Sequence, residues 1–360
     1  MSEPRIPAAI LGAGGYVGQN FARLLADHPY FEPLRLVAGD RTAGRRLEEV
    51  WQLVEAPPDE LASRRLERAS PAAIARAGIR LAFSALPSGT AGPIETELVR
   101  RGVSVFSNAA DHRMDRAVPL LVPEVNSPHL ALQRRRPHGA GLLVANPNCS
   151  AAGLVVALAP ILPVVRPRAI HVTTYQSLSG AGYPGVSGLA ITDNVVPYIE
   201  HEEEKIVAES QRILGALRGR AVEPLPVPIL AHCARVATRE GHLEAVTLEA
   251  RSAPTLTAIL AAWKRYDPLE GSGLPSAPHP PVEIRRERDR PQPLRDRWAG
   301  HPARARGMAV TVGRVRWAAP YLRFFLLSHN AVRGAAGASV LNAERAVVDG
   351  YLPRSGSSGR

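Results

Sequence analysis

The sequence predicts an α/β fold, with a doubly wound parallel sheet in the first part of the chain and an α+β domain with a mixed sheet in the second. Up to about residue 150, short apolar runs alternate with amphipathic stretches, which is typical of a parallel sheet covered on both faces. Beyond that point, longer segments alternate between polar and apolar residues, which is typical of strands with one covered face. A chain of 360 residues has room for two such domains.

The first part begins with a strand, a glycine turn and a helix. The apolar residues 6–11 predict the strand, and four side chains then follow at helical spacing: Val17, Phe21, Leu24 and Leu25. Further buried strands are predicted at 34–38, 79–86, 103–106 and 141–145. Ligands of such sheets lie at the carboxyl ends of the strands, so we expect functional residues where these runs end.

The second part begins with a predicted helix at 151–162, and we place the domain boundary next to Cys149. Four stretches then alternate like strands: 169–176, 235–239, 242–250 and 308–316. A proline- and arginine-rich segment at 274–306 predicts a long connection. An alanine-rich helical pattern occupies the end of 330–348.

The composition indicates a soluble protein of a reducing compartment, which we expect to be the cytoplasm. No apolar run approaches the roughly 18 residues of a membrane-spanning helix, and the sequence begins without a secretory signal pattern. Two cysteines cannot form a disulfide framework. The net charge of +11 comes from arginines without interleaved aromatic residues, so we predict no nucleic-acid surface. We also predict no metal site.

A glycine-rich turn between the first strand and the first helix predicts a Rossmann-like nucleotide site. Glycines at this place let the backbone approach a pyrophosphate at the N-terminus of the helix. The predicted contacts in this turn are Gly12, Gly14, Gly15, Tyr16, Val17 and Gly18.

The end of the second strand favours NADP over NAD. A carboxylate there would bind a ribose 2′-hydroxyl, whereas an arginine accommodates a 2′-phosphate. Asp40 is followed by Arg41 and Thr42, with Arg45 and Arg46 close behind. Three guanidinium groups against one carboxylate predict NADP, with Arg41 and Thr42 as contacts.

Cys149 is the predicted nucleophile. It stands between an apolar strand and an apolar helix, where free amides and the helix dipole favour the thiolate. Its neighbours Asn148 and Ser150 are polar turn and capping residues rather than core residues. Cys233, the other cysteine, lies at a strand edge without that setting. A thiolate that attacks an acyl carbon also needs a proton-handling partner, and His242 after the Glu240-Gly241 turn is the candidate.

Several ordered motifs resemble the aspartate-semialdehyde dehydrogenase family, in particular its archaeal and fungal branch, over nearly the whole chain. Residues 146–150 (NPNCS) resemble the nucleophile motif of that family, and residues 179–185 (SGAGYPG) with 193–194 and 197–199 are specific for the branch. The other matching segments are 107–110 (SNAA), 122–126 (VPEVN), 290–293 (RPQP) and 329–337 (HNAVRGAAG).

The resemblance implies the NADPH-dependent, reversible reduction of β-aspartyl phosphate to aspartate semialdehyde and phosphate, in the biosynthesis of lysine, threonine and methionine. Cys149 would form a thioester and His242 would act as general acid and base. The substrate residues implied by the family are Arg113, Gln176, Glu202, Lys205 and Arg235. The additional cofactor contacts are Ser84, Ser179, Gly180 and Asn330.

The family also implies an organisation. Residues 1–148, completed by a C-terminal helix at 331–360, would form the NADP-binding domain, and residues 149–330 the catalytic and dimerisation domain. The protein would be a homodimer or a homotetramer. Asp111 departs from the family, which carries smaller, less charged residues just before the phosphate-binding arginine, and the sequence predicts no role for it.

Three alternatives stay open at this point. Related enzymes reduce malonyl-CoA through the same cysteine and histidine, and more distant ones reduce N-acetylglutamyl phosphate. A non-catalytic NADP-binding paralogue is the third alternative, and the presence of both Cys149 and His242 speaks against it.

Overall fold

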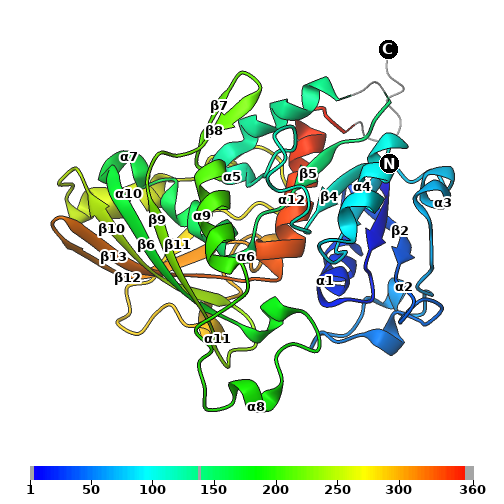
Figure 1. Cartoon of the computed structure of the whole chain (residues 1–360), viewed down its shortest axis with the longest axis horizontal. Helices are drawn as coiled ribbons and strands as arrows, with labels where there is room; N and C mark the ends of the chain where they lie inside the picture. Colours follow the sequence, from blue (N-terminus) through cyan, green and yellow to red (C-terminus); the bar gives the residue numbers. More distant parts are fainter. Residues whose placement is uncertain (1–3, 137–138, 353–360) are drawn as a thin grey trace.

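A computed structural model describes residues 4–136 and 139–352. Two β-sheets dominate the molecule. In Figure 1 the five-stranded sheet lies on the right and the six-stranded sheet on the left, with helices packed between them. Both ends of the described chain lie on the side of the five-stranded sheet.

The five-stranded sheet is parallel and has the strand order β2-β1-β3-β4-β5. Its strands are β1 (Ile6–Leu11), β2 (Phe31–Val37), β3 (Leu81–Ser84), β4 (Ser104–Ser107) and β5 (Leu143–Ala145). The register aligns their carboxyl ends, because Leu11 pairs with Val37 and Ser84, and Ser107 pairs with Ser84 and Ala145. Polar residues that follow the strands therefore meet at one edge of the sheet.

Both faces of this sheet are buried, as the apolar runs predict. Ala8 and Ile10 of β1 belong to one hydrophobic cluster, whereas Ala9 and Leu11 belong to another on the opposite face. The helices of this part of the chain are α1 (Tyr16–Leu25), α2 (Asp59–Ala62), α3 (Pro71–Arg76), α4 (Ala91–Arg100) and α5 (Pro123–Asn126), with short 3₁₀ segments at Glu48–Val50 and Ser127–Arg135.

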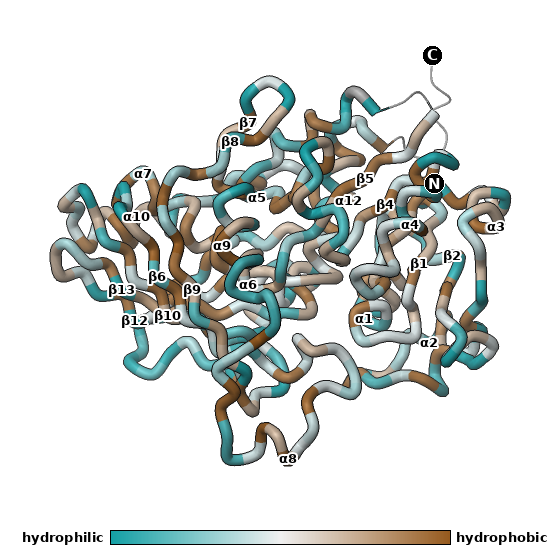
Figure 2. The backbone as a smooth tube through the Cα atoms, viewed as in Figure 1, coloured by the Kyte–Doolittle hydropathy of each residue, from teal (hydrophilic) through white to brown (hydrophobic). Residues whose placement is uncertain are grey.

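The six-stranded sheet is mixed, with the order β11-β12-β13-β10-β6-β9. Its strands are β6 (Pro167–Gln176), β9 (Ile229–Arg235), β10 (His242–Ala250), β11 (Val282–Ile284), β12 (Val310–Ala318) and β13 (Tyr321–Ser328). Side chains alternate along β10 between buried and half-buried, as predicted for a strand with one covered face. In Figure 2 the central strands carry brown, apolar stretches, whereas many surrounding loop residues are teal.

Helices cover the buried face of this sheet. They include α6 (Cys149–Leu158), α7 (Leu162–Val165), α9 (Glu202–Ile213) and α10 (Leu256–Arg265), whose apolar residues join the strands in one large hydrophobic cluster. The remaining elements are α8 (Gly188–Ile191), α11 (Pro293–Asp296), the hairpin β7 (Ala216–Arg218) and β8 (Ala221–Glu223), and 3₁₀ turns at Leu178–Ala181 and Ala303–Ala305.

The structure differs from the predicted elements in several places, among them the segment 274–306, which was predicted as a connection but contributes β11 to the six-stranded sheet. The strand predicted at 235–239 is wrong: the strand is Ile229–Arg235, and the chain then leaves the sheet toward the turn before His242. The predicted helix at 151–162 starts at Cys149 and ends at Leu158. Strand β13 was not predicted, because its apolar residues are nearly continuous and show no clear period.

The end of the chain returns to the five-stranded sheet. A π-helical segment, Val332–Ala336, leads into α12 (Gly337–Val348), which packs against α1 and joins the cluster on one face of that sheet. Of the predicted helix 331–360, residues 353–360 lie outside the described residues. Among residues 4–136 and 139–352, no helix combines the length and the apolar character that crossing a bilayer requires.

Candidate active site

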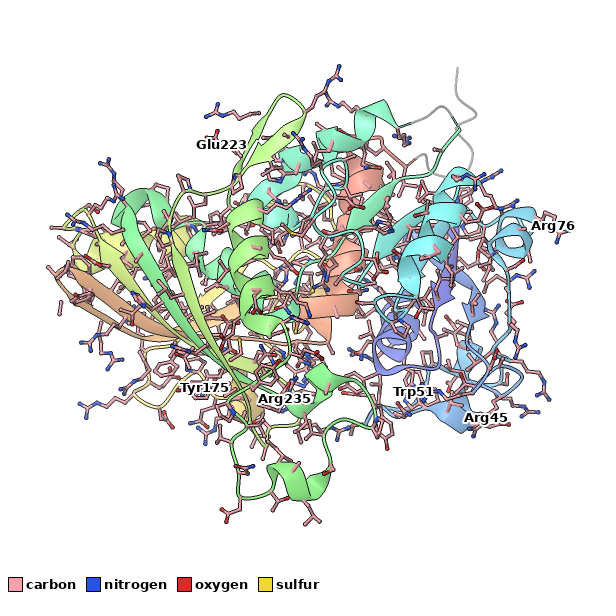
Figure 3. The ribbon with its side chains drawn as sticks, viewed as in Figure 1. Arg45, Trp51, Arg76, Tyr175, Glu223 and Arg235 are labelled. Atoms are coloured by element: carbon pink, nitrogen blue, oxygen red, sulfur yellow. The ribbon has the colours of Figure 1, made fainter. Side chains whose placement is uncertain are left out.

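A cavity of about 590 Å³ lies where the carboxyl end of the five-stranded sheet meets the six-stranded sheet. Figure 3 places Arg235 at this junction, whereas Arg45 and Arg76 lie on the outer side of the five-stranded sheet. The predicted site residues that line the cavity are Tyr16, Val17, Arg113, Cys149, Gln176, Ser179, Gly180, Glu202, Lys205, Arg235 and Asn330.

The turn between β5 and α6 presents Cys149 at the first position of the helix. The side-chain oxygen of Asn148 accepts hydrogen bonds from the amides of Ser150 and Ala151, at 2.9 and 3.2 Å, and so caps α6. The π-helical segment packs tightly on this turn, since a Cβ added to Gly334 would lie 2.6 Å from the Cβ of Cys149. Only glycine fits at this contact.

Cys149 and His242 form a pair. The Sγ of Cys149 lies 3.1 Å from the Nε2 of His242. The backbone amide of Ser177 donates to the Nδ1 of His242 over 3.1 Å, so a neutral imidazole carries its proton on Nε2 and points it toward the sulfur. His242 is therefore oriented to donate a proton at Cys149.

Burial is the largest influence on the pKa values of this pair. Burial and the nearby carboxylate of Glu202 raise the pKa of Cys149 to about 12, although Arg113 and Arg235 oppose the shift. Burial, together with the charge of Arg235, lowers the pKa of His242 to about 3. Burial therefore shifts the pKa of Cys149 in the direction opposite to the one expected from the helix terminus. Both pKa shifts favour the neutral forms, a thiol on Cys149 and a neutral imidazole on His242.

Glu202 lies at the centre of a buried hydrogen-bond network. Its Oε1 accepts from the side-chain amides of Asn148 and Gln176, each at 2.8 Å. Among the described residues, Oε2 has no hydrogen-bond partner and belongs to a side chain that lines the cavity. This carboxylate can receive a cationic group of a ligand.

Arg235, at the end of β9, is buried and donates to the carbonyl of Ser177 over 2.8 Å. Gly180 packs directly against it: an added Cβ would lie 2.8 Å from the Nη1 of Arg235 and 3.1 Å from the Cε1 of His242. A side chain at position 180 would therefore press on both the guanidinium and the imidazole.

Two further cationic side chains face the cavity near Cys149. The Nη1 of Arg113 donates to Glu209 over 3.0 Å, and its Nη2 donates to the carbonyl of Asn108 over 2.7 Å. Lys205 lies on α9 one turn after Glu202, and within the described part of the chain its ammonium has no ion-pair partner. Both groups can receive an anion.

Asp111 does not face these cations. Its carboxylate accepts from the amides of Gly89 and Gly92, each at 3.0 Å, at the N-terminus of α4. It therefore caps that helix, where a negative charge is favoured by the helix dipole. This accounts for an aspartate close in sequence to a predicted phosphate-binding arginine.

The glycine turn after β1 has the geometry of a phosphate cradle. Gly12 has φ +77°, and an added Cβ there would lie 2.6 Å from the carbonyl oxygen of Ala85. At Gly18 a Cβ would lie 2.1 Å from the oxygen of Gly12. The first turn of α1 contains no acidic residue, and no side chain caps its amides. These amides suit a pyrophosphate.

The end of β2 leaves one arginine available. Asp40 is paired with Arg68 at 2.6 Å, and Arg45 and Arg46 bond to residues of the neighbouring 3₁₀ turn. Arg41 is exposed and has no partner within the described residues. Thr42 packs beside the cradle, where its Oγ1 would lie 2.7 Å from a Cβ at Gly14. Ser84, in contrast, is fully buried, and the following residues 85–88 line the cavity instead.

Asn330 connects the turn before β10 to the loop after β6. Its Nδ2 donates to the Oγ of Ser179 over 2.8 Å, and its Oδ1 accepts from the amide of Gly241 over 2.9 Å. Tyr16 of the glycine turn donates its hydroxyl to Glu240, the residue before Gly241. The glycine turn and the segment that carries His242 are therefore directly linked.

Sequence reasoning missed Ser177, Glu209 and the role of Glu240. Glu209 follows Glu202 by seven residues on the same helical face, and that spacing was a usable signal. Ser177 acts through its backbone amide, for which the sequence offers no signal. Cys233 is buried, and among the causes of its raised pKa burial comes first.

Comparisons with known proteins agree with this architecture. The model "Semialdehyde dehydrogenase, NAD binding domain" matches residues 7–133, and "Semialdehyde dehydrogenase, dimerisation domain" matches residues 158–333. The crystal structure of aspartate semialdehyde dehydrogenase with NADP from Candida albicans has a TM-score of 0.86 and 33% identity, covering 97% of this chain and 100% of that one.

Two curated relatives carry different names. The chain is 41% identical to aspartate-semialdehyde dehydrogenase of Archaeoglobus fulgidus, over 94% of this chain and 97% of that protein. It is 38% identical to malonyl CoA reductase (NADP) of Metallosphaera sedula, over 97% and 99% of the two chains. The predicted fold class and the predicted resemblance are both confirmed, and the chain belongs to the semialdehyde dehydrogenase family.

Proposed function

We propose that this protein is an NADP-dependent aspartate-semialdehyde dehydrogenase, which converts β-aspartyl phosphate and NADPH reversibly to aspartate semialdehyde, NADP and phosphate. One observation carries the proposal: around the Cys149–His242 pair, a single cavity presents a carboxylate with a free oxygen and three separate cationic side chains. An amino-acid acyl phosphate has the complementary groups, namely an ammonium, a carboxylate and a phosphate.

Each group of the substrate has a partner in this proposal. Glu202 receives the ammonium on Oε2, since its Oε1 is already bound to Asn148 and Gln176. Arg235 binds the carboxylate with its remaining N–H groups, and Arg113 with Lys205 binds the phosphate. Gln176 orients the acyl carbon next to Cys149.

The thiol must lose its proton before it attacks, and we propose that a phosphate oxygen of the bound substrate accepts this proton and carries it away with the leaving phosphate. An ammonium bound at Glu202 neutralises the carboxylate that, together with burial, raises the pKa of Cys149. The Nε2–H of His242 stabilises the resulting thiolate by a hydrogen bond. The sulfur then bonds to the acyl carbon, the bond from that carbon to the phosphate oxygen breaks, and phosphate leaves with its electron pair. A thioester on Cys149 remains.

Bound NADPH would supply the hydride that reduces this thioester. We propose that the amides of the glycine turn would hold its pyrophosphate and Arg41 its 2′-phosphate, and that Ser179, Gly180 and Asn330 would contact the nicotinamide. The structure in complex with NADP from Candida albicans supports this choice of cofactor. The Nε2–H of His242 donates a hydrogen bond to the oxyanion formed by hydride addition, and the carbon–sulfur bond then breaks as the carbonyl re-forms, which releases the aldehyde and the thiolate.

We further propose that residues 1–148, completed by the C-terminal helix, form the NADP-binding domain, and residues 149–330 the catalytic and dimerisation domain. The two sheets and the two matched family ranges support this division. The exposed face of the six-stranded sheet, with Tyr175 and Leu230, is a suitable contact for a homodimer or a homotetramer. We propose that the enzyme acts in the cytoplasm.

The test is the phosphate dependence of the reverse reaction. Oxidation of aspartate semialdehyde by NADP should require added phosphate, and arsenate should replace phosphate. The Lys205→Ala variant should raise the KM for phosphate more than the KM for NADP, whereas Lys264→Ala, which changes the only other lysine, should alter neither. Turnover of malonyl-CoA with NADPH, without activity on aspartate semialdehyde and phosphate, would overturn the proposed substrate and leave the nucleophile assignment in place.

A further inference from the structure

Glu209 is a buried carboxylate at the active site to which the proposed mechanism gives no role. It is 3% exposed, and each of its oxygens accepts one hydrogen bond. Oε1 accepts from the Nη1 of Arg113 over 3.0 Å, and Oε2 accepts from the backbone amide of Asn148 over 2.6 Å. One side chain thus contacts both an anion-binding arginine and the peptide just before the nucleophile.

The helix α9 places this contact in register with the substrate residues. Glu202, Lys205 and Glu209 lie on one side of this helix, at a spacing of three, four and seven residues, with both carboxylates buried and the lysine half-buried. Glu202 holds the side chain of Asn148, and Glu209 holds the backbone amide of the same residue. The turn that carries Cys149 is therefore fixed to α9 at two points.

We infer that Glu209 is a positioning residue that fixes Arg113 and the Asn148–Cys149 turn relative to each other, so that the phosphate and the acyl carbon of one substrate are received at a set separation. The inference rests on the proposed function for the identity of the anion. Glu209 itself does not touch the reacting atoms.

The chemistry of the contact requires a carboxylate. Its two oxygens meet two donors, so a glutamine at this position would turn its NH₂ group toward either the Arg113 guanidinium or the Asn148 amide. Two donors facing each other in a buried site would displace one of these partners. Burial raises the pKa of the Glu209 carboxyl, and Arg113 and the Asn148 amide offset part of this rise.

The direction in which the KM for phosphate changes distinguishes a positioning role of Glu209 from a purely electrostatic one. Removing a negative charge beside an anion site should by itself tighten anion binding. We expect the opposite for Glu209→Gln, namely an increase of about tenfold in the KM for phosphate with the KM for NADP unchanged within about twofold. In an Arg113→Ala background the same substitution should change the KM for phosphate by less than about twofold, because its effect passes through Arg113.

Glu204→Gln is the matched control, since Glu204 is an exposed carboxylate on the same helix. Glu209→Asp keeps the charge, but its shorter side chain cannot reach both donors. We expect this variant to raise the KM for phosphate about threefold, and it replaces Glu209→Gln in the test if the glutamine variant does not fold. The inference would be overturned if Glu209→Gln lowered the KM for phosphate or left it unchanged. It would also be overturned if the substitution raised this KM equally in the Arg113→Ala background.

A binding measurement without turnover separates this inference from the proposed function. Inorganic phosphate should protect Cys149 of the wild type from alkylation by iodoacetamide, and Glu209→Gln should need about ten times more phosphate for half-protection. Equal protection of both proteins would overturn the inference alone. Absence of protection in the wild type would overturn the proposed function, and this inference with it.

Discussion

The two ends of the proposed active site are built in opposite ways. At the proposed nucleotide end the available groups are backbone amides and glycines, and Arg41, which has no partner within the described residues, is exposed. At the catalytic end the ligand-facing groups are buried side chains that bond to one another, as Glu202 does to Asn148 and Gln176. A substitution at the first end should therefore act locally, whereas one at the second should displace several partners.

The largest expected effect is at the catalytic end. Cys149→Ser should lower the rate of aldehyde oxidation by roughly 10⁴-fold, because a serine hydroxyl is a far weaker nucleophile at neutral pH. The dissociation constant for NADP, measured by fluorescence titration, should change little, because the glycine turn is a separate structure. Cys233→Ser is the control and should keep most of the activity. If Cys233→Ser abolished activity while Cys149→Ser remained active, the nucleophile would be misassigned.

A methyl group at Gly180 tests how rigid the catalytic end is. Its Cβ would lie 2.8 Å from the Nη1 of Arg235 and 3.1 Å from the ring of His242. We expect kcat/KM of Gly180→Ala to fall by about 100-fold, since small displacements of reacting groups are costly. Gly188→Ala, at a glycine with open space around its Cβ position, should have little effect. Equal kinetics of both variants would mean that the catalytic end adapts easily.

A smaller effect is expected at the nucleotide end. Arg41→Ala should weaken NADPH binding by about 1.5–3 kcal/mol, the cost of a charge-assisted contact to phosphate, and leave NADH binding nearly unchanged. Isothermal titration with each cofactor measures this difference. Arg76→Ala, at the outer surface seen in Figure 3, is the control. Equal losses for NADPH and NADH would contradict the 2′-phosphate assignment.

The smallest effect concerns stability and sharpens the boundary between the two ends. Asp111→Ala removes the cap of α4 and should lower the free energy of unfolding by about 1 kcal/mol. Urea denaturation measures the loss. The KM for phosphate should stay within about twofold, because the carboxylate faces the amides of Gly89 and Gly92. A large change in this KM would place Asp111 in the anion site.

Local features of this protein could be predicted from the sequence. The glycine turn follows an apolar strand directly, and Cys149 stands between a strand and a helix with a capping residue before it. Each pattern is complete within a few residues, so the local sequence contains the physical cause. The alternation along 242–250 likewise reports burial on one face of a strand.

Features that depend on partners far along the chain could not be predicted. Asp111 finds its donors 19 and 22 residues earlier, and Glu209 finds its donors 61 and 96 residues earlier. The segment 236–239 alternates like a strand, yet β9 ends at Arg235, from which the chain must turn toward His242. In each case tertiary contacts, rather than local preference, determine the outcome.

The contact between Gly334 and Cys149 has a consequence for how the protein matures. During synthesis Cys149 leaves the ribosome long before Asn330 and Gly334, which secure the loop of His242 and close the wall behind the sulfur. An amino-terminal half that folds early already contains the nucleophile, but neither His242 nor the packing that buries the thiol. The fixed position of His242 and the burial of the Cys149 thiol therefore both depend on residues that are synthesised late.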